Sequence, residues 1–443
     1  MEKIIELLKD NKLLEAKTKL IDLNVVDIAQ LFEEIDKENV VKTFRILPKD
    51  IAADVFSYLN YDEQRVIIES ITDSEISNII NDLFVDDAIN LLEEMPANVV
   101  KKILENAEEH KRTVINQFLN YPLNSAGSAM TIEYVDLKKE MTIEEAIKHI
   151  KKTGVDKETI DTCYVIDKDR RLEGVLSIRT IILSPNEAKI KDVMESKVIC
   201  VNTVDDQETV ANIFKKYDFT AMPVVDKENR LVGIITIDDI VDIIEQENTE
   251  DFQKMAAMEP SEEEYLKTNV FSLAKHRIIW LLVLMISATF TGNIIKKFED
   301  VLQSVVILAA FIPMLMDTGG NAGSQSSTLI IRGLALGEIK LNDFMKVIWK
   351  ELRVSSIVAV VLSLVNFLRL YLLEGTDIYI SITVCISLFC TVILAKVIGG
   401  VLPIIAKKFK LDPAIMASPL ITTIVDAFAL IIYFTTAKVL VGI

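Results

Sequence analysis

Apolar residues recur at helical spacing through residues 1–123, in units of about a dozen residues each. Pro48, Asp62, Ser74 and Pro96 interrupt this spacing, as residues at the start of a new helix do. A helix this short cannot bury an apolar face alone, so each one must pack against its neighbours. The pattern predicts an acidic α-helical superhelical domain, a small α-solenoid.

A different pattern, an internal repeat of short apolar strands, covers residues 124–248. The segment from Cys163 through Gly174 matches the segment from Met222 through Gly233, at an offset of 59 residues. The apolar strand positions and the acidic turn between the strands are in register in the two copies. Each copy therefore predicts the order helix, strand, turn, strand, helix, and the pair predicts an α/β architecture.

The two copies differ in length before this matched segment. Met130 matches Met194 at an offset of 64, so the first copy carries about five extra residues, which we place in the loop 157–161. This sets the limits of the copies at about 124–186 and 187–248.

Long apolar stretches dominate the rest of the chain. Roughly 20 apolar residues span a membrane, so five crossings and an all-α membrane domain over residues 275–443 are predicted, with a connecting helix over 249–274. An odd number of crossings places the two ends of this domain on opposite sides, and the basic segments near 275, 332–353 and 407–410 fall on one side. The predicted spans are 278–295, 301–331, 354–373, 378–406 and 413–437.

Charge divides the chain in the same place. Residues 276–443 carry 14 Lys and Arg against 10 Asp and Glu, whereas residues 1–275 carry 34 against 56, so the net charge of −18 splits into about +4 and −22. So acidic a front half argues against nucleic acid as a partner and suits a surface that meets cations. The chain opens on an amphipathic helix with acids instead of a signal peptide, so we expect the front half to lie in the cytoplasm and the C-terminus outside. The four cysteines lack metal-ligand spacing.

Asp426 is a lone carboxylate in the apolar run of the fifth predicted span. A charge in lipid costs at least about 2.5 kcal/mol unless it faces water or a partner, so such a residue marks an ion or proton path. The second span carries glycines, Asn321, Gln325 and several hydroxyls from Pro313 onward, none of which faces lipid cheaply. Together they predict a polar path built from the second and fifth spans, to which Asp317 either belongs or lies nearby at a membrane face.

The repeated copies resemble a tandem pair of CBS domains. In that family a Gly-x-x-Thr-x-x-Asp signature on the last strand holds a ribose, and Gly233, Thr236 and Asp239 of the second copy match it. The first copy lacks the acid, so the resemblance leaves binding of ATP open.

The whole arrangement, with the motif Pro313-x7-Asn321-x-Gly323-x-Gln325, resembles the MgtE-type magnesium channels and transporters over nearly the entire chain. The resemblance implies a homodimer in membrane lipid with one pore on its axis, where Asp426 binds hydrated Mg²⁺ and the pore-lining partners are Asn321, Gly319, Gly320 and Gln325.

Acids also follow the helix that leaves the second copy, from residue 238 to residue 251. Unneutralised, such a cluster repels itself, and divalent cations would bridge it. The resemblance implies that cytosolic Mg²⁺ bound there closes the pore. The implied sensor carboxylates are Asp206, Glu208, Asp218, Asp239, Asp242, Glu247, Glu250 and Asp251, with Asp82 and Asp86 in the helical domain.

The sequence therefore predicts a Mg²⁺ channel or transporter and no enzyme, since its histidines form no constellation and no Walker loop is present. Two alternatives stay open. One is a proton-coupled transporter of another divalent cation such as Mn²⁺ or Co²⁺, and the other is a non-conducting, membrane-anchored CBS sensor. An Asp with backbone carbonyls suits Mg²⁺, Mn²⁺, Co²⁺ and Ni²⁺ alike.

Overall fold

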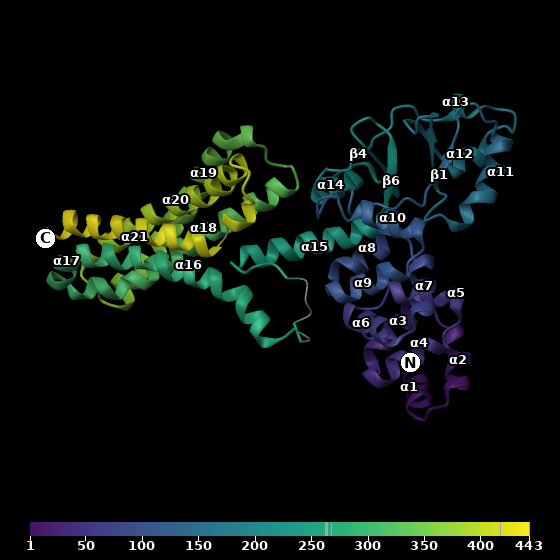
Figure 1. The fold of residues 1–443 in the computed structure, drawn as a ribbon. Coiled ribbons are helices and arrows are strands. Elements are labelled where there is room, and N and C mark those ends of the chain that lie inside the picture. Colours follow the sequence, from purple (N-terminus) through teal and green to yellow (C-terminus); the bar gives the residue numbers. More distant parts are fainter. Residues whose placement is uncertain (262–264, 267, 417, 443) are drawn as a thin grey trace. The chain divides into compact units, whose positions relative to one another are not determined.

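Short amphipathic helices build the first part of the chain in the computed structural model, which describes residues 1–261, 265–266, 268–416 and 418–442. Most of these helices pack against the next but one, as in α3 with α5, α5 with α7 and α8 with α10, which produces the expected superhelix (Figure 1). The helices are α1 Glu2–Lys9, α2 Leu13–Ile21, α3 Val25–Glu34, α4 Lys37–Ile46, α5 Lys49–Ser57, α6 Tyr61–Ser70, α7 Asp73–Asp82, α8 Val85–Glu94, α9 Ala97–Asn106 and α10 Glu109–Phe118.

The helix breaks follow local capping chemistry. Pro48 and Pro96 occupy the N-cap positions of α5 and α9, where a missing backbone N–H costs nothing. Thr72 begins α7 through a capping box with Glu75. Asp62 and Ser74, which the sequence pattern suggested as breaks, lie one residue inside the first turns of α6 and α7.

Each repeat folds into a three-stranded sheet flanked by helices. In the first repeat β1 (Val135–Leu137) runs parallel to β2 (Thr162–Ile166), which pairs antiparallel with β3 (Leu172–Ser177). In the second repeat β4 (Val201–Asn202), β5 (Ala221–Val225) and β6 (Leu231–Thr236) repeat this order. The helices of the pair are α11 Ile143–Thr153, α12 Ile178–Leu183, α13 Ile190–Val193, α14 Gln207–Tyr217 and α15 Ile237–Met255, with a 3₁₀ turn at Gly154–Asp156.

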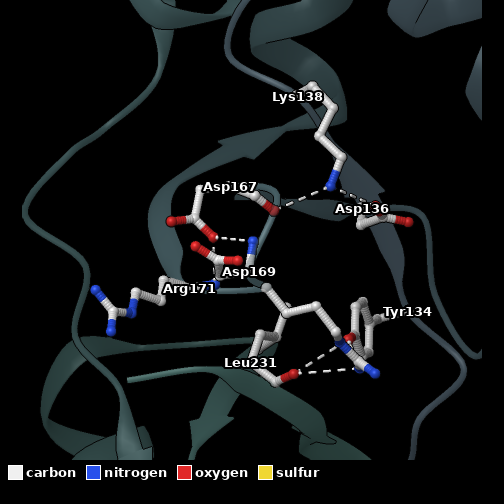
Figure 2. Close-up of polar contacts among 8 residues, drawn as sticks. Tyr134, Asp136, Lys138, Asp167, Asp169, Arg171 and Leu231 are labelled. Atoms are coloured by element: carbon white, nitrogen blue, oxygen red, sulfur yellow. Dashed lines mark hydrogen bonds and ion pairs between the residues drawn. The ribbon is translucent and has the colours of Figure 1, made fainter. Parts of the chain in front are cut away.

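The turn between the last two strands is built identically in both repeats. In the first repeat the Asp167 carboxylate accepts hydrogen bonds from the backbone N–H groups of Asp169 (2.7 Å) and Arg171 (2.9 Å), as Figure 2 shows. Asp226 does the same in the second repeat, for Glu228 and Arg230. The offset of 59 residues found in the sequence therefore also separates these equivalent hydrogen bonds.

The two repeats are joined by exchanged edges, in which the start of each repeat packs against the last strand of the other. Gly174 faces the Met194 side chain, and Gly233 faces the Met130 side chain, each with a sulfur 2.8 Å or less from where a Cβ would stand. Arg170 of the first turn donates to the Tyr134 hydroxyl (2.9 Å) and to a backbone carbonyl of β6 in the second repeat (3.3 Å) (Figure 2). Each repeat therefore completes the other.

The length difference between the repeats lies where the sequence placed it. Residues 154–161 separate α11 from β2 in the first repeat, whereas only residues 218–220 separate α14 from β5 in the second. The extra residues include the loop 157–161.

The chain forms two compact units, Met1–Ile244 and Glu245–Ile443. In the first unit Val85 and Ile89 of α8 and Phe118 of α10 share an apolar core with Val210 and Phe214 of the second repeat. The helical domain and the second repeat are therefore packed together.

The second unit contains helices long and apolar enough to cross a membrane, and five such spans occur within its described residues. They are built from α16 Val270–Lys297, α18 Ile312–Ala335 with the 3₁₀ turn Val306–Phe311 before it, α19 Phe344–Leu368 with a π-helical end Arg369–Leu373, α20 Ile378–Lys408, and α21 Ser418–Val441 after the 3₁₀ turn Pro413–Met416. A short helix, α17 Glu299–Ser304, lies between the first two, and a 3₁₀ turn at Leu341–Asp343 leads into α19.

The connecting segment differs from the predicted helix over 249–274. α15 begins inside the second repeat and ends at Met255, and the described residues between it and Val270, where α16 begins, form turns and irregular backbone. Ala257 has a positive φ of 53° and Pro260 follows, and neither continues a helix readily.

Candidate ion path and acidic cluster

Polar side chains form one exposed face of α18, a helix that is otherwise apolar enough to span a membrane. Asp317, Asn321, Gln325 and Thr328 are all exposed, and their spacing of four, four and three residues places them on one side of the helix. We call these four residues the polar face of α18. Exposure to lipid would be costly for every one of them, so this face must meet water or another polar surface.

The glycines of α18 lie on the opposite side, where they allow close helix packing. A Cβ on Gly319 would stand 2.8 Å from Thr391 of α20 and 3.0 Å from Val425 of α21, and a Cβ on Gly320 would stand 2.8 Å from Thr422. Gly319 and Gly320, predicted as pore-lining partners of Asp426, are buried in these contacts within one chain. Asn321 and Gln325, by contrast, are exposed as a pore-lining role requires.

Asp426 lies half-buried on α21, which packs against α18. Its Oδ1 atom is buried and has no hydrogen-bond partner among the described residues, and the negative charge of Asp317 on the polar face repels it. A buried carboxylate oxygen without a donor is costly unless a cation or water satisfies it. The structure thus brings the two predicted halves of the path, α18 and α21, side by side.

Two buried charged residues of the membrane unit were missed in the sequence analysis. Lys396 of α20 donates to Oε1 of Gln325 (3.3 Å), and Ser326 donates to Oε2 of Glu351 on α19 (2.6 Å). Both charged side chains are less than one-tenth exposed. The signal for Lys396 was the same as for Asp426, because it is a lone charge within an apolar run.

A cluster of carboxylates lies where the helical domain meets the repeats. Asp86 and Asp87 stand in the first turn of α8, Asp238 and Asp239 stand in the first turn of α15, and Glu158 comes from the extra loop of the first repeat. We call these five residues the acidic cluster. Of these, only Asp86 and Asp239 were predicted as sensor residues, and the extra loop was the signal that could have identified Glu158.

Burial and mutual repulsion raise the pKa values of four of these carboxyl groups. Burial raises the pKa of Asp86 well above its usual range, and the charge of Asp239 adds to this. Burial is also the largest cause that raises the pKa of Asp239 to about 7, although a hydrogen bond from Thr236 opposes it. Burial and the charge of Asp238 raise the pKa of Asp87 to about 6 and that of Glu158 to about 7. Near neutral pH the cluster therefore carries less negative charge than five free carboxylates would.

One cation partly offsets these charges. The Lys111 ammonium lies 4.0 Å from the Glu133 carboxylate and lowers the pKa of Asp87, and it donates to the Leu83 carbonyl. Burial lowers the pKa of Lys111 itself. Among the described residues, this one ammonium does not balance the acidic cluster together with Glu133, so added positive charge would stabilise the site.

The remaining predicted sensor residues are dispersed. Asp206, Glu208 and Asp218 are exposed around α14, and Asp82 is exposed at the end of α7. Asp242 is exposed and Glu247 half-buried along α15. Across the ranges that the structure describes, no group of three or more His, Cys, Asp or Glu side chains is arranged so that it could hold a metal ion as it stands.

The end of α15 is fixed to the membrane unit by a lysine. Lys254 forms ion pairs with Glu250 and with Asp412 (2.6 Å for the latter), and Asp412 also raises the pKa of the predicted sensor residue Asp251, after burial. Next to this pair, Met255 packs against Ile331 of α18 and Ala414 of the turn before α21.

The predicted nucleotide signature runs from β6, which carries Gly233 and Thr236, into the first turn of α15, which carries Asp239. The Thr236 hydroxyl donates to the Asp239 carboxylate (2.8 Å), and a Cβ on Gly233 would stand 2.6 Å from the Thr131 carbonyl oxygen. Asp239 is thus shared between the acidic cluster and the position that would hold a ribose.

Comparison with known proteins covers nearly all of the chain. Residues 23–124 match the MgtE intracellular N domain, residues 126–186 and 190–246 match the CBS domain, and residues 312–436 match the family described as a divalent cation transporter, MgtE.

Full-length relatives have the same extent. The chain is 34% identical to the magnesium transporter MgtE of Bacillus subtilis, over 98% of this chain and 96% of the relative. It is also 34% identical to the magnesium transporter MgtE of Thermus thermophilus, over 95% of this chain and 93% of the relative.

Two solved structures resemble the front part. The soluble part of a magnesium transporter is 29% identical with a TM-score of 0.52, covering 56% of this chain and 97% of that one. The cytosolic domain of the Mg²⁺ channel MgtE in complex with ATP is 33% identical with a TM-score of 0.51, covering 54% of this chain and 97% of that one.

Proposed function

Because this chain belongs to the MgtE family of divalent cation transporters, a family of multi-pass membrane proteins and not of enzymes, we propose that it carries Mg²⁺ into the cell along the polar face of α18 and past Asp426. One observation carries the proposal. Four polar side chains are exposed on a membrane-spanning helix beside a buried carboxylate oxygen that has no donor in the described part of the chain. An anchor helix needs neither feature, so they argue against a non-conducting sensor.

The polar face also supports a homodimer. A single chain leaves Asn321 and Gln325 uncovered within the membrane, and a second copy related by a two-fold axis would cover them with the same residues. The ion path then runs on the axis, between two polar faces. Two Asp426 carboxylates would flank it.

The chemistry of this path suits a hydrated divalent cation. Mg²⁺ loses its water reluctantly, so a conducting site must accept hydrogen bonds from bound water with a few oxygens. Asp426, Asp317 and the amide oxygen of Asn321 are such acceptors. The absence of Cys and His from the exposed face of α18 makes a soft-metal site unsuitable.

We propose further that cytosolic Mg²⁺ closes the path by binding at the acidic cluster and along α15. Bringing α8, α15 and the loop of Glu158 together confines five carboxylates, and a divalent cation would neutralise them in that packed arrangement. By linkage, if Mg²⁺ favours the packed arrangement, packing raises the affinity for Mg²⁺ by the same factor.

ATP is proposed as a second ligand of the repeats, since the similar cytosolic domain was solved in complex with ATP and this chain keeps Thr236 and Asp239. Asp239 cannot serve a ribose and a Mg²⁺ ion independently. Binding of ATP and of regulatory Mg²⁺ should therefore be coupled.

The same proposal sets the orientation. Five spans place α15 and the C-terminus on opposite sides, and Arg332, Lys346 and Lys407 fall on the side of α15. Basic residues prefer the cytoplasmic side. The N-terminal part is then cytoplasmic and the C-terminus is outside.

The test is flux of each divalent cation into liposomes that hold the purified chain, with Mg²⁺ varied on the side of the acidic cluster. The proposal predicts Mg²⁺ flux that follows the membrane potential and falls as Mg²⁺ on that side rises. Flux that requires a pH gradient would favour the proton-coupled alternative, and no flux of any cation would favour the anchored sensor.

A further inference from the structure

Lys396 is a buried lysine inside a membrane-spanning helix. Its side chain is about 5% exposed, and its ammonium lies 3.3 Å from Oε1 of Gln325, which belongs to the polar face of α18. A lysine at this depth is costly and is seldom found without a function. Because Gln325 is exposed on that face, this one side chain separates the Lys396 ammonium from the proposed ion path.

The hydrogen bond fixes the orientation of the amide. Lysine can only donate, so Gln325 must turn its carbonyl oxygen toward Lys396 and leave its NH₂ group for its other surroundings. The outer surface of a hydrated cation presents water hydrogens, which need acceptors. Gln325 therefore offers the ion path a donor where Asn321, one turn away, remains able to offer an acceptor.

The positive charge of Lys396 is not cancelled locally. Within the part of the membrane unit that the structure describes, no ion pair joins Lys396 to a carboxylate, and the other buried charge, Glu351, accepts its hydrogen bond from Ser326. Lys396 and Glu351 thus contact consecutive residues of α18 without pairing with each other.

We propose that Lys396 acts as a fixed positive charge that weakens cation binding at the level of Gln325 and so speeds the exit of the ion. This inference rests on the proposed path along the polar face of α18. Repulsion between fixed charges grows with the charge of the ion, so a divalent cation meets twice the repulsion of a monovalent one. An ion that binds strongly near Asp426 and weakly near Gln325 can leave again, which conduction requires.

The test compares Lys396→Gln, Lys396→Met and Lys396→Arg in the full chain, reconstituted in liposomes, by Mg²⁺ flux against Mg²⁺ concentration. Both neutral variants should lower the half-saturating Mg²⁺ concentration by roughly 10-fold and also lower the maximal flux, because the ion is held longer. Lys396→Arg keeps the charge and should restore both values. The matched control is Lys407→Met, since Lys407 also joins α20 to α18, through the Leu334 carbonyl (3.0 Å).

A merely structural role would reduce the maximal flux and leave the half-saturating concentration unchanged, and that result overturns the inference. If Lys396→Met does not assemble, Lys396→Gln, which can still donate to Gln325, carries the test alone. Unchanged half-saturation in the neutral variants, with flux abolished by Asp426→Asn, refutes only the role of Lys396. Full flux in Asp426→Asn refutes the proposed path itself.

Discussion

The Asp86 carboxylate is buried, the Asp239 carboxylate is half-buried, and the two repel each other, although Asp86 belongs to the helical domain and Asp239 to the last helix of the second repeat. Two like charges buried together destabilise the arrangement that brings them together. The packing of α8 against the second repeat therefore depends on whatever neutralises these two residues, either protons or a cation.

Without divalent cations this packing should weaken as pH rises. The pKa values of Asp87, Glu158 and Asp239 are raised to about 6, 7 and 7, so the folded state binds more protons than the unfolded state above about pH 4. Stability must then fall as pH rises from about 4 to about 7. Thermal unfolding of the full chain in detergent and chelator, from pH 5 to pH 8, should show a falling first transition. A transition that rises over this range would contradict the prediction.

Neutralising the pair should reduce this dependence, although Asp87 and Glu158 still titrate. Asp86→Asn with Asp239→Asn keeps the shape of both side chains without their charge, so the packed arrangement should persist at pH 8 in chelator, where the unaltered chain opens. Limited proteolysis of the 119–134 segment, with and without Mg²⁺, measures this. Asp27→Asn, an exposed acid on α3, is the matched control and should keep the Mg²⁺ dependence of the unaltered chain. A double variant that still needs Mg²⁺ for protection would refute the role of the pair.

The close contact of α18 with α20 predicts a strong effect of one methyl group. A Cβ on Gly399 would stand 2.1 Å from the Gly323 carbonyl oxygen, and backbone cannot move aside cheaply. Gly399→Ala should destabilise the membrane unit by about 1–3 kcal/mol, as overpacking does. Thermal unfolding in detergent measures the loss.

Gly292→Ala is the control for this substitution. Gly292 lies inside the membrane helix α16 and a Cβ there meets nothing within 4 Å, so helix propensity alone should raise stability by about 0.5–1 kcal/mol. Equal effects of the two substitutions would show that the contact between Gly323 and Gly399 is not tight.

Asp412 should hold the end of α15 on the membrane unit. Asp412→Asn leaves Lys254 with Glu250 and weakens the contact beside Met255 and Ala414. A partly exposed pair is worth about 1 kcal/mol or less, so amide hydrogen exchange of residues 250–256 should quicken by no more than about five-fold. Lys346→Met, which breaks an exposed pair with Asp343, should leave that exchange unchanged. Exchange that stays slow in Asp412→Asn would mean that apolar packing alone holds the helix.

Much of the fold was predictable because its signals are local. The offset of 59 residues between Gly174 and Gly233 reflects equivalent strand pairs, and the apolar runs gave the five spans. The helix that leaves the second repeat was expected from its acids, but the connecting helix predicted over 249–274 was too long, since α15 ends at Met255. The exchanged edges between the repeats depend on contacts between distant residues and leave no periodic signal.

The site was predictable in part. Asp426, Asn321 and Asp239 stood out as polar residues in apolar surroundings or at motif positions. Lys396 carried the same signal as Asp426 and was overlooked, whereas Glu158 did not stand out, because its partial burial among other carboxylates becomes visible only in the packed structure. The small residues Gly319 and Gly320 illustrate the opposite problem, since the sequence cannot separate a glycine that packs helices from one that exposes carbonyls.

The most direct test of the central claim is Mg²⁺ flux through Asp426→Asn in voltage-clamped liposomes, beside the unaltered chain and Asp377→Asn, an acid that caps α20 outside the apolar spans. Asparagine keeps the shape of Asp426 and removes the charge that would hold a hydrated cation. The account predicts that Asp426→Asn assembles normally and loses Mg²⁺ flux at least about 10-fold, a barrier change of about 1.4 kcal/mol, while Asp377→Asn conducts normally. Undiminished, voltage-driven Mg²⁺ flux through assembled Asp426→Asn would contradict it.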